Sequence, residues 1–194
     1  SSAASDVYKR QASAAVGAFA SALGMMVTNL TIGKKKYIDV EAEMEDIRSR
    51  LEALQQELVG LTDRDAEAFE PLSRAYGLPK ETEEQRIEKE RVMEKALYEA
   101  SVVPLQIMKT VFRVMEDLEV LGEKGSRLAV SDVGVAVLFA RAALEGASLN
   151  IYINTRLMKN REQAERLNKE SDELIAEAGR LQEKIYTGVL AKIR

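Results

Sequence analysis

The chain contains no histidine and no cysteine in its 194 residues. The missing histidine removes the commonest general base, the Ser-His and Cys-His nucleophile pairs, and the usual nitrogen ligand for zinc. The missing cysteine removes disulfides and thiolate nucleophiles. An enzyme built on this chain must therefore work with Asp, Glu, Lys, Tyr or Ser, and we expect no metal site.

Tryptophan is also absent, and there are only 3 prolines and 11 glycines. Hydrophobic residues make up 46% and charged residues 31%, which is typical of a helical globular protein rather than a disordered or β-rich one. A length of 194 residues favours one domain. The formal net charge is −4 and basic residues are interspersed with acidic ones, so we expect no nucleic acid partner.

Residues 12–29 carry no charge and are nearly long enough to cross a bilayer. Ala, Ser and Gly dominate this stretch, and no signal-peptide pattern is recognisable, so a helix buried in protein is favoured over a membrane span. The sequence therefore predicts no membrane association and a cytoplasmic location.

Residues 1–11 have no amphipathic period and join the uncharged stretch abruptly. One coding of residues 5–11 resembles the transposon end used in DNA library preparation. We therefore interpret residues 1–11 as adaptor-derived sequence, with a disordered natural tail as the alternative. Residues 12–194 are assigned to one helical domain.

Large apolar residues recur at spacings of three and four over residues 40–61, which predicts a long amphipathic helix capped by Asp39 and ended by Gly77. The same spacing recurs over residues 164–185. Thr82 and Gln85 match a capping box that opens another helix.

Pro104 predicts a break that divides residues 82–122 into two helices. Ser131 and Asp132 are expected to cap a helix that is apolar on nearly every side. Six helices with short connections predict an all-α antiparallel bundle, and the length of the helices predicts a homodimer that covers their apolar surface.

Three consecutive lysines, Lys34, Lys35 and Lys36, follow the uncharged helix. One cation at a helix carboxyl end is explained by the helix dipole, but three exceed that need and suggest an anion site. Asp132 is open to two interpretations. It is either a helix cap or a preorganised carboxylate that exchanges a proton with a reacting amine. Asn150 and Asn154 lie four residues apart, so they share a helix face, either as interior hydrogen-bonding groups or as ligand contacts.

Three separated segments resemble the formimidoyltetrahydrofolate cyclodeaminase and methenyltetrahydrofolate cyclohydrolase family. They read ASALGMMVTNLTIGKKKY at 20–37, DRDAEAFEPLSRAYGLPKETEEQR at 63–86 and SDVGVAVLFARAALEGASLNIYIN at 131–154. The resemblance implies an all-helical homodimer that acts on one-carbon folates without a metal or redox cofactor. It departs at the amino end, where the family's Gly-rich turn is absent, and this departure predicts weak folate binding.

Within that resemblance, Asp132 and Lys36 are the expected catalytic residues. The expected folate contacts are Asn29, Lys34, Lys35, Tyr37, Ser131, Gly134, Asn150 and Asn154, with the lysines holding the glutamate tail of a folate that is expected to be polyglutamylated. The family catalyses cyclodeamination of 5-formimidoyltetrahydrofolate and reversible hydrolysis of 5,10-methenyltetrahydrofolate to 10-formyltetrahydrofolate. The alternative is a non-catalytic helical interaction or scaffold protein, for which the amphipathic helices alone would be sufficient.

Overall fold

The computed structural model describes residues 2–194, with side chains described from Gln11 onward. Helices account for nearly all of this part of the chain, and no strand occurs within it. In chain order the elements are α1 (Ser2–Asn29), the 3-10 helix η1 (Lys35–Val40), α2 (Glu41–Tyr76), α3 (Glu83–Lys124), the 3-10 helix η2 (Arg127–Ala129), α4 (Val130–Thr155) and α5 (Arg161–Ile193). The prediction of an all-α fold is confirmed.

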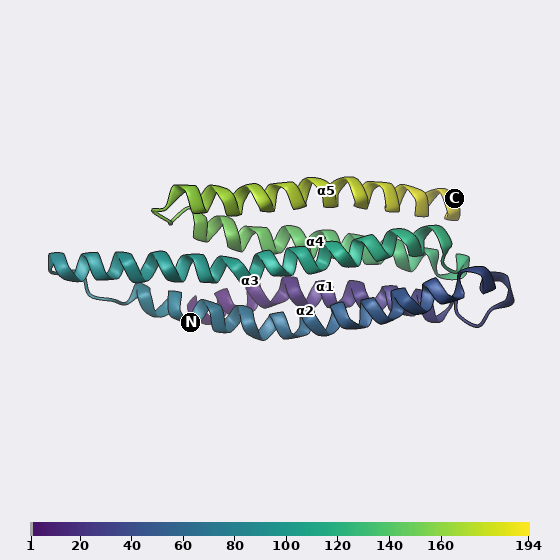
Figure 1. Ribbon diagram of the computed structural model, residues 1–194, viewed down its shortest axis with the longest axis horizontal. Coiled ribbons are helices and arrows are strands. Elements are labelled where there is room, and N and C mark those ends of the chain that lie inside the picture. Colours follow the sequence, from purple (N-terminus) through teal and green to yellow (C-terminus); the bar gives the residue numbers. More distant parts are fainter. Residues whose placement is uncertain (1) are drawn as a thin grey trace.

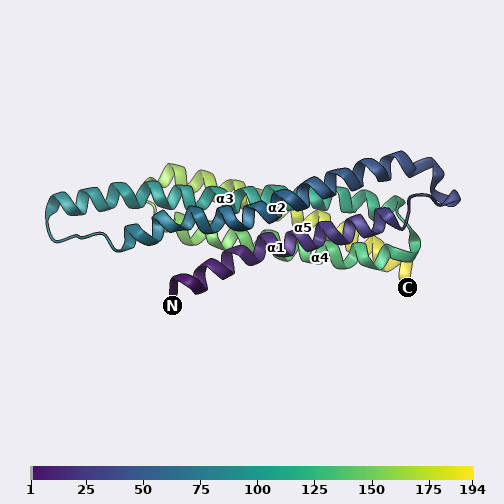
Figure 2. The same ribbon diagram turned by 90° about the horizontal axis from the view of Figure 1, so that it is seen from below.

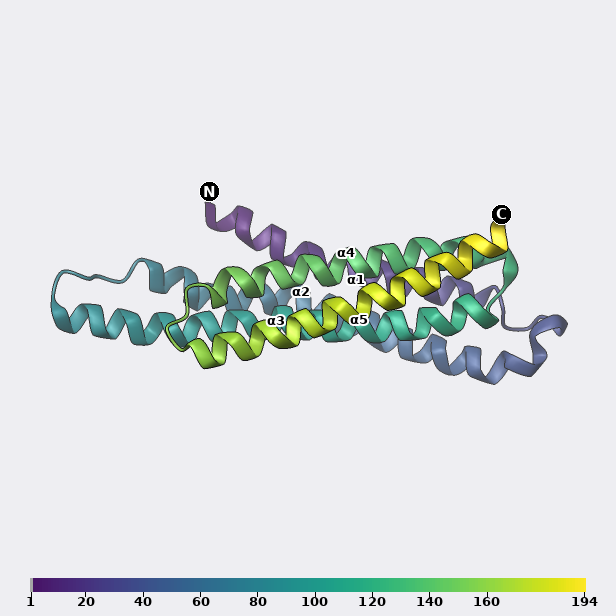
Figure 3. The ribbon, with the colours of Figure 1, turned by 90° about the horizontal axis from the view of Figure 1, so that it is seen from above.

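The long helices lie side by side and form an elongated bundle (Figure 1). α3 is the central helix, since it packs against α1, α2, α4 and α5. The loop after α1, the turn between α3 and α4, and the carboxyl terminus gather at one end of the bundle (Figure 2). The α2–α3 loop and the α4–α5 turn lie at the other end, where the α2–α3 hairpin reaches beyond the other helices (Figure 3).

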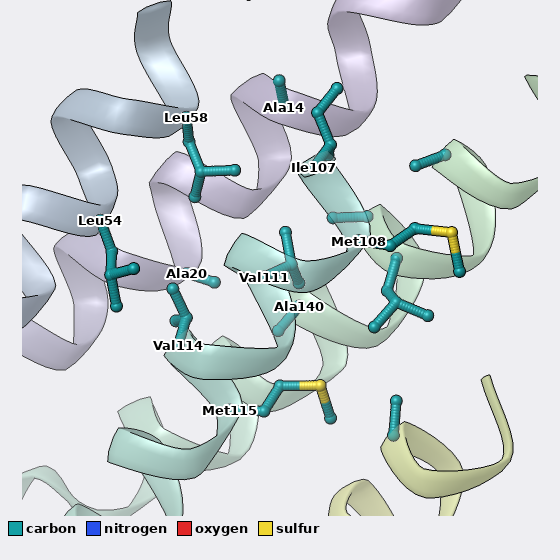
Figure 4. Packing of buried hydrophobic residues seen from close by; sticks show 14 of the residues in the cluster. Ala14, Ala20, Leu54, Leu58, Ile107, Met108, Val111, Val114, Met115 and Ala140 are labelled. Carbon is teal, nitrogen blue, oxygen red and sulfur yellow. The ribbon is translucent and has the colours of Figure 1, made fainter. Parts of the chain in front are cut away.

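The apolar stripe expected on α2 forms one wall of the core. Leu54 and Leu58 of α2 face Val111 and Val114 of α3 in the interior of the bundle (Figure 4). The stripe residues Met44, Ile47, Leu51, Leu54, Leu58 and Leu61 are all buried. Because burying one leucine side chain contributes about 1.5–3 kcal/mol, this stripe is a main source of the stability that holds α2 on α3.

α3 continues through Pro104, so the prediction of six helices is wrong and the described part of the chain has five long helices. Proline lacks the N–H that would donate to the carbonyl of Ala100 four residues earlier. The side chain of Asn154 on α4 donates to that carbonyl instead, with a distance of 3.0 Å between Asn154 Nδ2 and Ala100 O. A group from another helix replaces the lost bond, and the helix does not break.

Asn154→Ala is expected to lower the free energy of unfolding by about 1–3 kcal/mol, because it leaves the buried Ala100 carbonyl without this donor. In a Pro104→Ala background residue 104 regains its N–H, so the same Asn154→Ala substitution should cost less. Urea unfolding of the four proteins in this cycle measures the difference. An equal cost in both backgrounds would show that Asn154 does not compensate for the proline.

The capping box at the start of α3 is confirmed. The Gln85 N–H donates to Thr82 Oγ1 at 3.2 Å, and the Thr82 N–H donates to Gln85 Oε1 at 3.1 Å. These two bonds satisfy amide groups that the first turn of a helix would otherwise leave without an acceptor.

The other two predicted caps are wrong. Asp39 lies inside η1, and the residue that precedes α2 is Val40, which makes no side-chain cap. Asp132 lies inside the first turn of α4, which Ala129 precedes without a side-chain cap. In both places a 3-10 turn leads directly into the helix; at α2, the Glu41 N–H donates to a backbone carbonyl of that turn. No side chain is needed to start these helices.

Small residues of α1 allow close helix packing. A Cβ added at Gly17 would lie 2.7 Å from Val111 Cγ2 on α3. A Cβ added at Gly146 on α4 would lie 2.8 Å from Ser13 Oγ on α1. Both distances are shorter than real Cβ contacts, so a neighbour would have to move. At Gly146 the Ser13 hydroxyl could rotate away, whereas at Gly17 the neighbours are the buried Val111 and Leu58 side chains, so glycine allows the close approach of α1 to α2 and α3 there.

Within α1, Gln11–Asn29 is long and apolar enough to cross a membrane by length and composition. Half of this segment is buried against other helices. The core helix of a globular protein can have the same length and apolar composition, so this finding does not identify a membrane span. The prediction of no membrane association is therefore left untested.

The interpretation of residues 1–11 as adaptor-derived also stays a prediction. The α1 backbone is helical from Ser2, while residue 1 and the side chains of residues 1–10 lie outside the described part.

Candidate functional site

The loop that carries the three lysines is held against the turn between α3 and α4. Thr31 Oγ1 donates to the Val27 carbonyl at 2.7 Å and accepts a hydrogen bond from the Ser126 N–H at 2.9 Å. Gly33 has φ +77°, a left-handed conformation that favours glycine, and its N–H donates to Glu41 Oε1 at 2.9 Å. The sharp turn at Gly33 places the lysines directly after it.

Tyr37 forms the second link between these segments. Its hydroxyl oxygen accepts a hydrogen bond from the Arg127 N–H at 3.1 Å. This bond is the main reason that the pKa of Tyr37 is lowered; desolvation opposes it, and Ser126, Lys36 and Lys34 make smaller contributions that lower the pKa. Lys36 Nζ lies 5.6 Å from the centre of the Tyr37 ring, within the range of a cation–π contact.

The lysines form a cluster of positive charge that is open to solvent. Lys35 and Lys36 are exposed and Lys34 is half-buried. Within residues 11–194, no carboxylate forms an ion pair with any of the three. The ammonium groups are therefore available to an anionic ligand.

Two further cations extend this cluster, and neither was predicted from the sequence. Arg127 is exposed in η2, where its backbone meets Tyr37. Arg48 of α2 reaches back to the end of α1, with 3.5 Å between its Nη1 and Asn29 Oδ1. Neither is near the lysines in the sequence, so only the meeting of helix ends in the folded chain reveals them.

Asp132 and Ser131 lie on the first turn of α4, at the same end of the bundle as the lysine loop. Asp132 is half-buried, and its carboxylate makes no hydrogen bond or ion pair with another described side chain. The positive end of the α4 dipole lies beside this carboxylate. Asp132 lies five residues after Arg127, whose backbone N–H donates to the Tyr37 hydroxyl.

This arrangement suits an anionic substrate that requires proton transfer. The cations of the loop attract carboxylates, and the carboxylate of Asp132 accepts a proton without help from histidine. No group of three or more Asp, Glu, His or Cys side chains that could hold a metal occurs in the part of the chain that the structure describes.

Three of the predicted contact residues do not join this cluster. Asn150 and Asn154 lie near the other end of α4, roughly 27 Å and roughly 33 Å from Asp132 along the helix axis. Gly134 is buried against α5: a Cβ there would lie 3.1 Å from Val189 Cγ1. The structure therefore gathers Asn29, Lys34, Lys35, Lys36, Tyr37, Ser131 and Asp132 at one end of the bundle. Gly134 lies at the same end but packs against α5, and Asn150 and Asn154 lie towards the other end of α4.

Comparison with known families gives one match over most of the chain. The sequence model described as Formiminotransferase-cyclodeaminase matches residues 11–173. A methenyltetrahydrofolate cyclohydrolase from Methylorubrum extorquens is 43% identical over 182 residues, which are 94% of this chain and 88% of that protein. The similarity therefore extends over nearly the full length of both proteins.

Two further relatives carry the name cyclodeaminase. A formimidoyltransferase-cyclodeaminase from Mus musculus is 30% identical over 85% of this chain, but the match spans only 30% of that protein. The crystal structure of formiminotetrahydrofolate cyclodeaminase from Thermotoga maritima superimposes with a TM-score of 0.76 at 31% identity, and the match covers 95% of this chain and 86% of that one.

Proposed function

Since the chain belongs to the formiminotransferase-cyclodeaminase family, we propose that it is a one-carbon folate enzyme that reversibly hydrolyses 5,10-methenyltetrahydrofolate to 10-formyltetrahydrofolate. The observation that carries this proposal is the 43% identity to a methenyltetrahydrofolate cyclohydrolase over nearly the whole of both chains. The relative from Mus musculus is matched over only 30% of its length, so the activity of that whole protein is weaker evidence for the activity of this chain.

Cyclodeamination of 5-formimidoyltetrahydrofolate is the second candidate. Its support is the match to the solved cyclodeaminase from Thermotoga maritima, which covers 95% of this chain. In this reaction N10 attacks the formimino carbon and ammonia leaves, whereas in hydrolysis water attacks the methenyl carbon. Both reactions pass through a tetrahedral carbon between two nitrogens, so one site is able to serve either.

In the proposed hydrolysis, Asp132 accepts a proton from the attacking water as the new C–O bond forms. It then gives that proton to N5 as the C–N5 bond breaks. The hydroxyl proton of the intermediate is released when the N10-formyl carbonyl forms, so the reaction yields one proton overall. Lys36 stabilises the oxygen on which negative charge develops, and Asn29, Tyr37 and Ser131 orient the folate. Every step is a proton transfer or a C–O or C–N bond change, so the proposal includes no metal or redox cofactor.

The absorbance of 5,10-methenyltetrahydrofolate tests the proposal. Faster loss with the protein present, in buffer containing a metal chelator, supports the cyclohydrolase. Formation of the same absorbance from the formimino substrate with ammonia release supports the cyclodeaminase. The assay includes a variant with a Gly-rich turn placed before Ala12. If neither reaction is accelerated by either protein, the chain is a non-catalytic helical interaction protein.

Lys34 and Lys35 are proposed to hold the glutamate tail of a polyglutamylated folate. Lys34→Ala/Lys35→Ala is expected to raise KM about tenfold for a pentaglutamate substrate and to change KM little for the monoglutamate, because each lost charge-assisted contact weakens binding. kcat should stay constant, since the contact is the same in the ground and transition states. Lys95→Ala/Lys169→Ala is the matched control on exposed lysines of α3 and α5. Equal KM changes for both substrates would contradict tail binding.

We also propose that the enzyme is a homodimer that pairs through α1 and α4. These neighbouring helices carry large apolar side chains that are more than a third exposed, and residues 12–29 of α1 include no charge. The exposed members are Phe19 and Met26 of α1, Leu30 directly after it, and Val135, Leu138, Phe139, Leu149 and Ile153 of α4. We call them the α1–α4 face. It runs roughly 27 Å along α4, and a second copy with the same face would cover it symmetrically.

A further inference from the structure

A cavity of about 290 Å³ lies at the end of the bundle opposite the lysine loop. Its lining comes from the α2–α3 loop, the first turns of α3 and the α4–α5 turn. The length of α2 separates it from the lysine loop by roughly 54 Å. It therefore has no residue in common with the proposed folate site.

Hydrogen bonds hold both walls of this cavity. Lys89 Nζ donates to the carbonyls of Tyr76 at 2.8 Å and Leu78 at 2.7 Å, which fixes the α2–α3 loop on α3. The Glu94 carboxylate accepts from the N–H groups of Lys159 at 2.7 Å and Asn160 at 2.9 Å, which fixes the α4–α5 turn on the same helix. The cavity is thus formed before a ligand arrives, so binding needs little ordering of the chain.

At the rim of the cavity, some positively charged side chains are not neutralised by the neighbouring acidic residues. Both acidic residues of the lining already have partners. Glu94 accepts the two backbone hydrogen bonds described above, and Glu90 forms an ion pair with the Lys159 ammonium group at 2.5 Å. Lys80 has no ion pair within residues 11–194. Arg86 pairs with Glu83 at 2.7 Å, but both side chains are exposed and such pairs are weak, so Arg86 is able to exchange that partner for a ligand.

The floor of the same cavity is apolar. Leu97 is buried, Met93 is half-buried, and Leu157 is exposed at the mouth. A flat or ring-shaped apolar group gains free energy by covering these side chains. An anionic group on that ligand lies within the reach of the Lys80 and Arg86 side chains, which approach from the rim.

We propose that this cavity is a second ligand site that binds an aromatic carboxylate. The aromatic ring packs on Met93 and Leu97 at the floor, and the carboxylate binds Lys80 and Arg86 at the rim. The p-aminobenzoylglutamate half of a folate has this chemistry and is the probe that tests it. The site goes beyond the proposed function, since it takes part in neither reaction and its occupancy is measured without turnover.

The experiment is a titration of the full chain, labelled at the methionine methyl groups, with p-aminobenzoylglutamate. The Met93 resonance should shift and saturate, while those of the wholly buried Met44 and Met115 should not move. Lys80→Glu/Arg86→Glu should weaken the binding seen at Met93 about tenfold or more, because two charge-assisted contacts are reversed. The control Arg91→Glu/Lys95→Glu makes the same change of charge on exposed residues of α3 outside the cavity lining and should retain the wild-type affinity.

Four results would overturn the site. The first is no shift of the Met93 resonance, and the second is a shift that Lys80→Glu/Arg86→Glu leaves intact. The third is an equal loss of affinity in the control variant. The fourth is displacement of the bound probe by inorganic phosphate at a concentration equal to that of the probe, which would show a binding site for anions that does not recognise the ring. Circular dichroism confirms that each variant is folded. The cyclohydrolase assay is independent of this titration, so inactivity there leaves the result at Met93 interpretable.

Discussion

Replacing Asp132 with asparagine is expected to lower kcat by about 100-fold or more, because a positioned general acid–base contributes about that factor and an amide cannot take the proton of water. The substitution keeps the shape of the side chain. The half-buried carboxylate contributes to stability mainly through the α4 dipole, about 0.3–1 kcal/mol, so the midpoint of thermal unfolding should fall by only a few degrees. Initial rates of methenyltetrahydrofolate loss and a melting curve measure the two effects.

Asp63→Asn is the matched control for this prediction. Asp63 is exposed on α2, towards the opposite end of the bundle from the lysine loop, so the same change of chemistry should leave kcat unchanged. If Asp132→Asn retains wild-type turnover, its carboxylate serves only the first turn of α4.

The amphipathic helices could be predicted because their signal is local. The stripe of α2 repeats at spacings of three and four, and only one side of a helix presents residues with that period. Burial of Met44, Leu51 and Leu58 follows from the sequence alone. The apolar character of α4 was equally visible, although its sequence does not say which of its sides stays exposed.

The continuity of α3 could not be predicted, because its cause is in another part of the chain. A proline inside a helix ordinarily removes a hydrogen bond and favours a break. Here Asn154, fifty residues later, supplies the missing donor to Ala100. Asn154 is recognisable in the sequence as a polar residue of an apolar helix, but no local pattern pairs it with Pro104.

The candidate site could be predicted in part for the same reason. The lysines and Asp132 were recognised separately, and the bundle brings their segments to one end through the bonds of Thr31 and Tyr37 to the α3–α4 turn. Asn150 was expected with them because it shares α4 with Asp132. Helix geometry separates two such residues by the length of the helix between them, so membership of one helix is weak evidence for one site.

Phe19→Glu is expected to convert the proposed homodimer into a monomer. Phe19 is 62% exposed on the α1–α4 face, so the substitution should leave the folded monomer intact. In a symmetric pair each substitution occurs twice, and burying two unpaired carboxylates costs several kcal/mol. The dissociation constant should rise by about 100-fold or more, which sedimentation over a range of concentrations measures.

Val59→Glu is the control, since Val59 is 57% exposed on α2 outside the α1–α4 face and its substitution should leave the dimer unchanged. A wild-type chain that sediments as a monomer at every concentration would contradict the proposal. Binding of the wild type, but not of Phe19→Glu, to lipid vesicles would instead assign the face to a membrane surface.

The oligomeric state also bears on catalysis, because the α1–α4 face adjoins the candidate site. Leu30 of the face directly follows Asn29, and Val135 lies three residues after Asp132, about one helical turn away. A second copy seated on this face would shield the carboxylate and the lysines from bulk water, which strengthens their interactions with substrate. The Phe19→Glu monomer should therefore lose turnover as well as its partner, although the substitution lies nearly three turns from Asn29 along α1. Full activity in a stable monomer would show that each chain forms a complete site alone.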